Sequence, residues 1–299
     1  MNAPHTIASR SRLDAALAVL PELARQIGEG AARREADREL PFEGFAKFRG
    51  TELGALRIPA ARASLVEVIV TLAAADSSLS HALPLHYDVT EALRLSLRSA
   101  SNDLQIERVL SGAIFGGALT ERHTSRPGEV TSSLVREGDH FLASGRKYYS
   151  TGTLFSDYAR INVQGEDDAR VAIVIPVARE GLRIDDDWDG MGQRMTASGT
   201  LVLDQVRVEP DEVVERDSCS LVGRHGGALR QLHLVAVAAG IVRNVAADAR
   251  RYVIEFGRPV LHSPAASAHE DHFIQQTVGE LTAHSHAIDA LVRENARPP

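Results

Sequence analysis

The chain has 299 residues, 44% hydrophobic and 24% charged, a composition typical of a globular protein long enough for more than one domain. Its formal net charge of -7 comes from acidic and basic residues dispersed along the chain, so we expect neither nucleic acid nor an anionic membrane as a partner. The single cysteine, Cys219, excludes an intrachain disulfide framework and a thiolate metal cluster.

The N-terminal segment 1–12 lacks the continuous apolar run of an export signal. The most apolar stretch, 65–75, is interrupted by Glu67 and is too short to cross a bilayer. We therefore expect a cytoplasmic protein without a membrane anchor.

Residues 1–111 are predicted to form an N-terminal α-helical domain. Ala, Leu, Arg and Glu are abundant, and apolar residues from Leu13 onward recur with helical spacing. Proline and glycine, among them Pro41, Gly54 and Pro84, divide the segment. The pattern therefore predicts several packed helices rather than one long helix.

Residues 112–216 are predicted to form a central antiparallel β-domain, a barrel or a sandwich. Short apolar runs alternate there with clusters of Gly, Asp and Asn. The runs cover 138–142, 160–163, 171–176 and 200–208.

Residues 217–299 predict a C-terminal helical domain. Leu229, Leu232, Val235 and Ala236 belong to an apolar stripe along a long helix, and a second helix is expected after Ala268, ending near 295. The order helical, β, helical indicates an α+β fold and not repeated βαβ units.

Other motifs give weaker signals. Gly190 and Gly192 lack the third glycine and the following helix of a dinucleotide-binding loop. His269 and His272 have the spacing of metal ligands on a helix, but a polar helix start is the preferred interpretation, and no metal site is predicted. The sequence also lacks a Gly-x-Ser-x-Gly elbow, so hydrolase chemistry is not favoured.

Three segments of the β region are more informative. They are Gly117-Ala-Leu-Thr-Glu121, Gly145-Arg-Lys-Tyr-Tyr-Ser-Thr-Gly152 and Trp188-Asp-Gly-Met-Gly-Gln-Arg-Met-Thr-Ala-Ser-Gly-Thr200. Each segment alone is better explained by an ordinary sheet with polar turns. Together, in this order and between helical regions, they resemble the acyl-CoA dehydrogenase superfamily of flavoproteins.

The resemblance implies a flavin on the β-domain. A backbone amide and a hydroxyl at the positions of Leu119 and Thr120 meet the pyrimidine edge in that family, where donors stabilise the reduced ring. An aromatic ring at the position of Tyr149 covers one face of the flavin, and a hydroxyl at the position of Thr151 lies near N5. The flavin-binding residues implied are Gly117, Leu119, Thr120, Tyr149, Ser150 and Thr151.

Within the superfamily the chain is similar to the reduced-flavin monooxygenases of bacterial desulfurisation, the dibenzothiophene monooxygenase-like branch. Asp185-Asp-Asp-Trp188 leads into the third segment as in that branch. The branch also keeps a histidine near the flavin, so His86 is the predicted catalytic residue, together with Thr151. By itself, a histidine in an apolar helix is more often a core residue.

The resemblance bears on the cofactor as well. Val253 stands where FAD-binding dehydrogenases carry an arginine that contacts the pyrophosphate, which favours FMN over FAD. Arg250 or Arg251 offers an alternative cation.

The implied function is that of a flavin-dependent oxidoreductase. A separate flavin reductase supplies reduced FMN, which reacts with molecular oxygen and transfers one oxygen atom from a C4a-hydroperoxyflavin to a small organosulfur or related apolar substrate. The alternatives are an FAD-dependent acyl-CoA dehydrogenase and a noncatalytic flavin-binding remnant. The resemblance further implies a homotetramer. Because family members continue through more C-terminal helices, we expect a truncated chain whose second catalytic residue belongs to the missing part.

Overall fold

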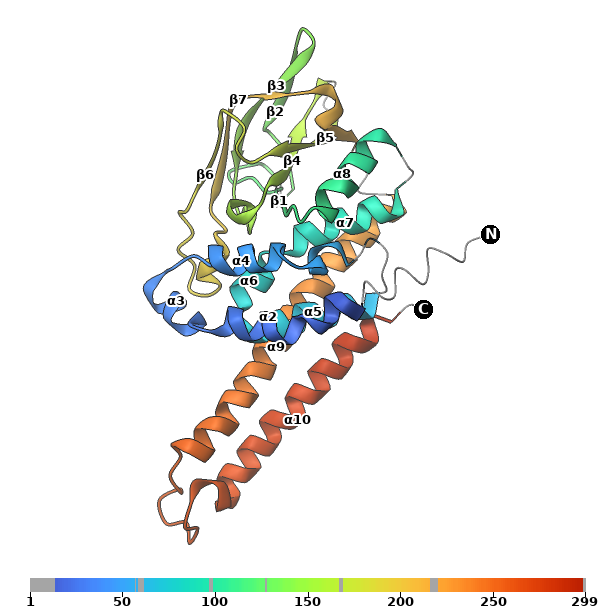
Figure 1. Cartoon of the computed structure of the whole chain (residues 1–299). Helices are drawn as coiled ribbons and strands as arrows, with labels where there is room; N and C mark the ends of the chain where they lie inside the picture. The colour runs from blue at the N-terminus through green and yellow to red at the C-terminus, as the bar shows by residue number, and fades with distance from the viewer. Residues whose placement is uncertain are drawn as a thin grey trace, which may run out of the picture.

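The computed structural model describes residues 14–56, 58, 62–96, 99–126, 128–166, 169–215 and 220–297. The predictions made for segment 1–12 and for Cys219 lie outside these residues. A layer of N-terminal helices lies below a β-domain. Of the two long C-terminal helices, the first crosses this layer, the second ends at it, and both project from it on the side away from the sheet (Figure 1). The predicted α+β order of helices, strands and helices is confirmed.

The N-terminal helices are short because proline, glycine and capping residues end them. They are α2 (Leu20–Gly28), α3 (Ala31–Asp37), α4 (Phe42–Arg49), α5 (Arg62–Ala75), α6 (Ser77–His81), α7 (Pro84–Leu95) and α8 (Ala100–Leu110), with a 3-10 turn, η1 (Glu52–Ala55). Pro84 opens α7, where the first turn needs no backbone N–H. The Asp76 carboxylate caps α6 by accepting from the Ser78 and Leu79 N–H groups at 3.1 Å.

The strands form one 8-stranded sheet in the order β6-β7-β3-β2-β4-β5-β8, with β1 paired to β4. They are β1 (Phe115–Ala118), β2 (Ser133–Glu137), β3 (His140–Lys147), β4 (Tyr158–Gln164), β5 (Arg170–Pro176), β6 (Leu182–Asp185), β7 (Thr200–Val208) and β8 (Val213–Glu215). Most neighbouring strands are antiparallel, as predicted. The β1–β4 pair is parallel, because these strands are joined by a crossover through β2 and β3 and not by a hairpin.

Alternation along β4 separates two environments. Ala159, Ile161 and Val163 are 0% exposed and belong to the core of the β-domain. The residues between them, Arg160 and Asn162, lie on the opposite face of the strand. That face looks toward α7 and α8, where Asn162 is 4% exposed and the Arg160 side chain is 23% exposed.

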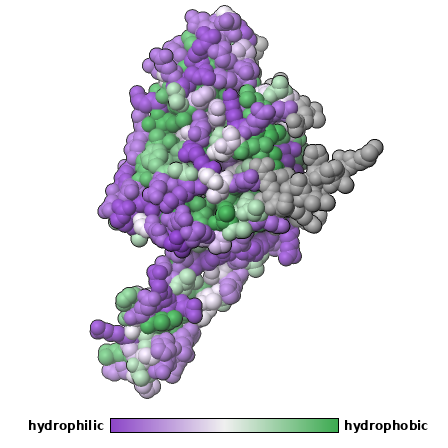
Figure 2. Space-filling model, in the orientation of Figure 1, coloured by the Kyte–Doolittle hydropathy of each residue, from purple (hydrophilic) through white to green (hydrophobic). Residues whose placement is uncertain are grey.

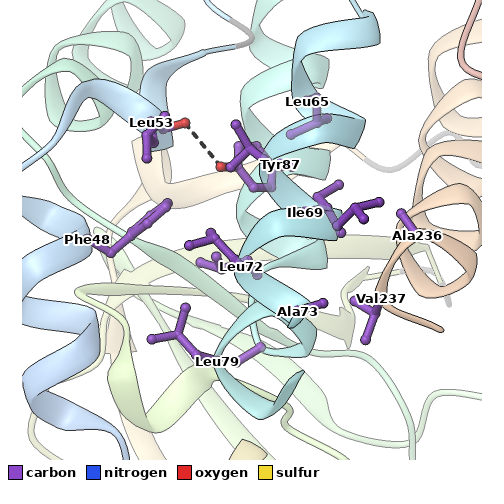
Figure 3. Packing of buried hydrophobic residues seen from close by; sticks show 14 of the residues in the cluster. Phe48, Leu53, Leu65, Ile69, Leu72, Ala73, Leu79, Tyr87, Ala236 and Val237 are labelled. Atoms are coloured by element: carbon purple, nitrogen blue, oxygen red, sulfur yellow. Dashed lines mark hydrogen bonds between the residues drawn. The ribbon is translucent and has the colours of Figure 1, made fainter. Parts of the chain in front are cut away.

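The helical core combines both ends of the chain. It includes Ile69 of α5, Tyr87 of α7, and Ala236 and Val237 of α9 (Leu221–Glu255) (Figure 3). The Tyr87 hydroxyl donates to the Leu53 carbonyl at 3.0 Å, which satisfies a polar group inside this core. The N-terminal and C-terminal helices are therefore parts of one packed unit.

Helices α9 and α10 (His272–Asn295) form a projecting hairpin (Figure 1). By length and composition α9 is the one helix among the described residues that could cross a membrane. Its buried residues lie between Gly226 and Gly240, where it packs against α5 and α7. Farther out the hairpin carries large exposed apolar side chains amid polar surface (Figure 2); they include Tyr252, Ile254, Phe256, Leu261 and Phe273.

Candidate active site

The three motif segments, far apart in sequence, meet in the fold. Thr120 and Tyr148 form an isolated β-bridge, in which the Tyr148 N–H donates to the Thr120 carbonyl at 2.9 Å. Ser150 donates to the Gly199 carbonyl from its N–H at 3.1 Å and from its hydroxyl at 2.7 Å. The first segment is thus joined to the second, and the second to the third. We call this arrangement the motif cluster.

Tyr149 presents an aromatic ring on the surface of the motif cluster. Its side chain is 48% exposed. Its backbone has φ 57°, a conformation that non-glycine residues adopt only at a cost in free energy. The Trp188 ring meets it edge-on at 6.1 Å between centroids, and the Arg122 guanidinium lies 5.1 Å from its centroid. The hydrogen bonds of the next residue, Ser150, hold this conformation in place. A fixed and exposed aromatic face is suited to stacking on a planar ligand.

Thr151 belongs to a chain of three hydroxyl groups. The Thr196 hydroxyl donates to the Gln193 carbonyl at 2.8 Å. It lies 2.7 Å from the Ser198 hydroxyl, which in turn lies 2.7 Å from the Thr151 hydroxyl. Because each hydroxyl has one proton, Ser198 must donate to Thr196, and Thr151 must donate to Ser198. The Thr151 oxygen therefore has only its acceptor capacity left for a further hydrogen-bond partner.

A buried ion pair between Glu121 and Lys147 lies next to the motif cluster. The Glu121 carboxylate accepts from the Lys147 ammonium group, and from the Ser132 N–H and hydroxyl at 3.0 and 2.8 Å. Burial alone would raise the pKa of Glu121, but the hydrogen bonds from Lys147, Thr131 and Ser132 outweigh it and lower the pKa to about 2. This clamp fixes the end of β1 against the end of β3, and so positions Thr120 beside Tyr148.

Gly117, a predicted flavin residue, has a packing role in this structure. The Thr153 hydroxyl accepts from its N–H at 3.0 Å and donates to its carbonyl at 3.1 Å. A Cβ atom at this position would lie 2.9 Å from the Leu85 side chain. Glycine is thus required where β1 approaches α7, and sequence reasoning did not identify Thr153 as its partner.

Leu119 connects the motif cluster to a cavity of about 350 Å³. The cavity lies between the β-domain, α7, α8 and the first turn of α9, and Leu85, Val89, Phe115 and Val174 form part of its apolar wall. Ligand pockets commonly have volumes of roughly 300–1,000 Å³, so this cavity matches a small molecule. Predicted flavin residues and a separate substrate-sized space are therefore adjacent.

Sequence reasoning missed the polar residues that line the cavity, among them Asp88, Arg160, Asn162 and Arg230. The Asp88 carboxylate accepts a hydrogen bond from the Arg230 guanidinium at 2.6 Å. The Arg160 guanidinium lies 3.8 Å from the same carboxylate. Burial lowers the pKa of Arg160, and the nearby Asp88 charge opposes this effect. One signal for Arg160 was present in the sequence, a cation inside an apolar strand.

His86 is placed differently from the residues of the motif cluster. Its Nε2 donates to the Gly54 carbonyl at 2.9 Å, and its Nδ1 accepts from the Phe115 N–H at 3.3 Å. The side chain is 1% exposed, and burial lowers its pKa to about 4. Leu85 and Asp88 of the same helix line the cavity, whereas His86 faces away from it. Its predicted role in catalysis stays a prediction, and its visible contacts are those of a structural residue.

The two histidines with metal-ligand spacing, His269 and His272, belong to the described residues. Within them no group of three His, Cys, Asp or Glu side chains is arranged to hold a metal ion. His269 lies in the turn η6 (Ala268–Glu270), and His272 is the first residue of α10.

Known proteins provide an independent comparison. No protein-family model matches the chain. A dibenzothiophene monooxygenase of Mycolicibacterium goodii is 28% identical over 246 residues, which cover 78% of this chain and 59% of that protein. A Pseudomonas putida protein named probable FMNH2-dependent monooxygenase is 28% identical over 312 residues, covering 99% of this chain and 76% of that protein.

The fold is also that of a solved flavoprotein. The crystal structure of FMN-bound TdsC from Paenibacillus sp. A11-2 matches with a TM-score of 0.83 at 24% identity, over 94% of this chain and 75% of that chain. This likeness establishes the architecture of the chain. Against the dibenzothiophene monooxygenase of Mycolicibacterium goodii, the chain spans 59% of the relative's length.

Proposed function

We propose, from the premise that this chain has the acyl-CoA dehydrogenase-like fold and is similar to FMNH2-dependent monooxygenases, that it binds reduced FMN and oxygenates a small organosulfur compound. The proposal includes molecular oxygen as a substrate and a separate flavin reductase, both in the cytoplasm. Reduced FMN, when bound, supplies the electrons that activate oxygen.

The motif cluster carries this proposal. It combines an exposed aromatic ring, Tyr149, with a hydroxyl acceptor, Thr151, and both contact the third motif segment through Trp188 and Ser198. This set fits a planar flavin whose reduced N5 carries a proton to donate. In the proposed complex Tyr149 covers one face of the ring, Thr120 lies at its pyrimidine edge, and Thr151 accepts the hydrogen bond from N5–H.

The cavity beside Leu119 would hold the substrate. Its apolar wall, which includes Leu85, Val89, Phe115 and Val174, would contact the apolar part of the substrate. Its volume of about 350 Å³ suits a small molecule better than an acyl-CoA thioester. The dehydrogenase alternative therefore has less support than oxygenation.

Trp188, the only tryptophan, offers a direct binding assay. A flavin stacked on Tyr149 would quench the fluorescence of Trp188, whose ring centroid lies 6.1 Å from that of Tyr149. We expect saturable quenching on titration with FMN, and a loss of affinity of about two- to ten-fold in Tyr149→Leu, since aromatic stacking contributes roughly 0.5–1.5 kcal/mol. Tyr252→Leu, a change to an exposed ring of the hairpin, is the matched control. Equal affinity in all three proteins would contradict the proposed site.

A second measurement separates the reactions. The complex with chemically reduced FMN is mixed with oxygen in a stopped-flow instrument, and a transient spectrum distinct from oxidised and reduced flavin is expected. Dye reduction by an acyl-CoA without such a transient would indicate the dehydrogenase. Binding of oxidised flavin with neither signal would indicate the noncatalytic remnant.

Assembly is part of the same proposal. The apolar side chains of the hairpin, Phe256 and Phe273 among them, are 66% and 62% exposed. We expect association through this surface into a homotetramer, and sedimentation velocity of the chain measures it directly.

A further inference from the structure

Arg160 is a charged residue in a partly buried position, with its side chain 23% exposed and at ion-pair distance, 3.8 Å, from Asp88. It lies near the middle of β4, between Ala159 and Ile161, whose side chains are 0% exposed in the core of the β-domain. Because side chains alternate along a strand, Arg160 points to the opposite face, where α7 covers the sheet. Its guanidinium therefore reaches the cavity beside the motif cluster.

The charges that line the cavity do not cancel. Asp88 contributes one negative charge, and Arg160 and Arg230 contribute two positive charges, which leaves a formal excess of one positive charge. Asp88 accepts a hydrogen bond from Arg230 at 2.6 Å, whereas it lies 3.8 Å from Arg160, beyond hydrogen-bond distance. Among the residues that the structure describes, the Arg160 guanidinium makes no hydrogen bond.

The surroundings increase the effect of this charge. Leu85, Phe115 and Val174 form apolar wall next to it, and a charge interaction is stronger where water is scarce. Guanidinium is less strongly hydrated than ammonium and binds planar oxyanions through two parallel hydrogen bonds. Asn162, 4% exposed and also lining the cavity, has an amide that can donate a further hydrogen bond.

We propose that this cavity binds a small organic anion, with a sulfinate, sulfonate or carboxylate group on Arg160 and an apolar body against Leu85, Phe115 and Val174. The predicted substrate was apolar, and this inference replaces it with an amphipathic one. It rests on the proposed function only in taking the bound anion to be the substrate. Asp88 is a positioning residue, because it holds Arg230 and limits the positive charge of the cavity.

The binding test needs no flavin and no turnover. The probe is 4-fluorobenzenesulfinate, and 4-fluorophenyl methyl sulfone is its neutral analogue of similar size. Both are followed by the broadening of their ¹⁹F NMR signal as the full chain is added. We expect the sulfinate to bind at least about ten-fold more tightly, since a charged hydrogen bond contributes roughly 1.5–3 kcal/mol. Equal affinity of the two probes would overturn the inference.

Substitution assigns the effect to one residue. Arg160→Gln is expected to weaken sulfinate binding at least about ten-fold and to leave sulfone binding within about two-fold. Arg183→Gln is the matched control, because it removes the same charge from an exposed side chain of β6. A sulfinate affinity that is unchanged in Arg160→Gln, or lowered equally in Arg183→Gln, contradicts the inference.

A second variant is expected to change sulfinate affinity in the opposite direction. It keeps the inference testable if the Arg160→Gln protein does not fold. Asp88→Asn raises the formal charge of the cavity lining by one unit, so sulfinate binding is expected to tighten several-fold while sulfone binding stays constant. Weaker sulfinate binding in a folded Asp88→Asn protein would overturn the inference.

The flavin phosphate is the other possible source of an oxyanion. FMN and lumiflavin, which lacks the phosphate, are titrated against wild type and Arg160→Gln with Trp188 fluorescence as the readout. We expect equal losses, or none, for the two flavins. A loss confined to FMN would assign Arg160 to the cofactor and overturn the substrate site, whereas a failure of both flavins to bind would contradict the proposed function and leave the sulfinate result intact.

Discussion

The ammonium group of Lys147 is paired with the carboxylate of Glu121 inside the β-domain, where their side chains are 0% and 4% exposed. Burying either charge alone would be costly, because water is lost without compensation. The pair therefore forms as a unit, and with Thr131 and Ser132 it joins β1, β2 and β3 next to the motif cluster.

Removing one partner of this pair is expected to destabilise the fold severely. Lys147→Met leaves the Glu121 carboxylate buried without its cation, and we expect a loss of about 3–5 kcal/mol in the free energy of unfolding. Urea denaturation followed by circular dichroism measures it. The double variant Lys147→Met/Glu121→Leu should recover most of the loss, whereas Arg33→Met in an exposed pair with Glu39 should cost less than about 1 kcal/mol. A small effect of Lys147→Met would show that the pair does not carry this energy.

Two buried histidines make the fold sensitive to acid. Burial lowers the pKa of His86 and of His233 to about 4, below the ordinary value of 6.5. As the pH falls through 6.5, the unfolded chain takes up these protons first, so stability is present above 6.5 and is lost progressively between 6.5 and 4. Each histidine contributes a slope approaching about 1.4 kcal/mol per pH unit. Glu121, with a pKa lowered to about 2, adds a further loss at lower pH, below its ordinary value of 4.5.

His86→Gln separates a structural role from a catalytic one. Glutamine has one amide that can donate to Gly54 but leaves the Phe115 N–H without its acceptor, so we expect a loss of about 1–3 kcal/mol. The dependence of stability on pH between 6.5 and 4 should become shallower by the share of one histidine. If the His86 hydrogen bonds contribute only to folding stability, FMN affinity, measured by Trp188 fluorescence, should stay within about two-fold of wild type. A normal unfolding curve combined with a slower reaction of the reduced complex with oxygen would support the predicted catalytic role instead.

The chain of hydroxyl groups behind Thr151 should select the redox state of the flavin. Reduced N5 carries a proton and oxidised N5 does not, and the Thr151 proton is already directed to Ser198. Ser198→Ala releases that proton toward N5, so the preference for reduced over oxidised FMN should fall about three- to ten-fold, the equivalent of one hydrogen bond. Spectroelectrochemical titration of the complex measures the shift, and Ser111→Ala, at an exposed hydroxyl, is the control. An unchanged potential in Ser198→Ala would mean that Thr151 does not contact N5.

Gly152 is required at the turn that carries Thr151. Its φ is 75°, and a Cβ atom there would lie 2.1 Å from the Ala82 carbonyl oxygen. Gly152→Ala should cost about 3 kcal/mol or more, because backbone strain and a steric clash add. Gly138 has φ 66° with no atom within 4 Å of its virtual Cβ, so Gly138→Ala isolates the strain at about 1 kcal/mol. Equal thermal midpoints for the two variants would contradict the clash.

Much of the fold and the motif cluster could be predicted because the signals are local. The predicted strands at 160–163, 171–176 and 200–208 lie within β4, β5 and β7, and the two predicted C-terminal helices are α9 and α10. The order of the three motif segments indicated the family resemblance, and the structure joins Thr120 to Tyr148 and Ser150 to Gly199.

The cavity could not be predicted, because it depends on which side of each element is covered. Arg160 alternates with apolar residues as a solvent-facing side chain would, and helices α7, α8 and α9, distant in sequence, form the rest of the cavity that it lines. The position of His86 shows the same difficulty. One residue along a helix turns the side chain by about 100°, which separates Leu85 in the cavity wall from His86 in the interior. The stripe on α9 was partly wrong for this reason, since Val235 is 52% exposed and His233 is 1% exposed.

The shared helical core has a consequence for synthesis of the protein. Helix α5 is buried against α9, which the ribosome makes only after the whole β-domain has been produced. At roughly 5–20 residues per second, the apolar face of α5 waits on the order of ten to thirty seconds for its partner. The first helices of the nascent chain thus lack their packing partner during this interval. A holdase that binds 65–75 at this stage would raise the yield of folded protein.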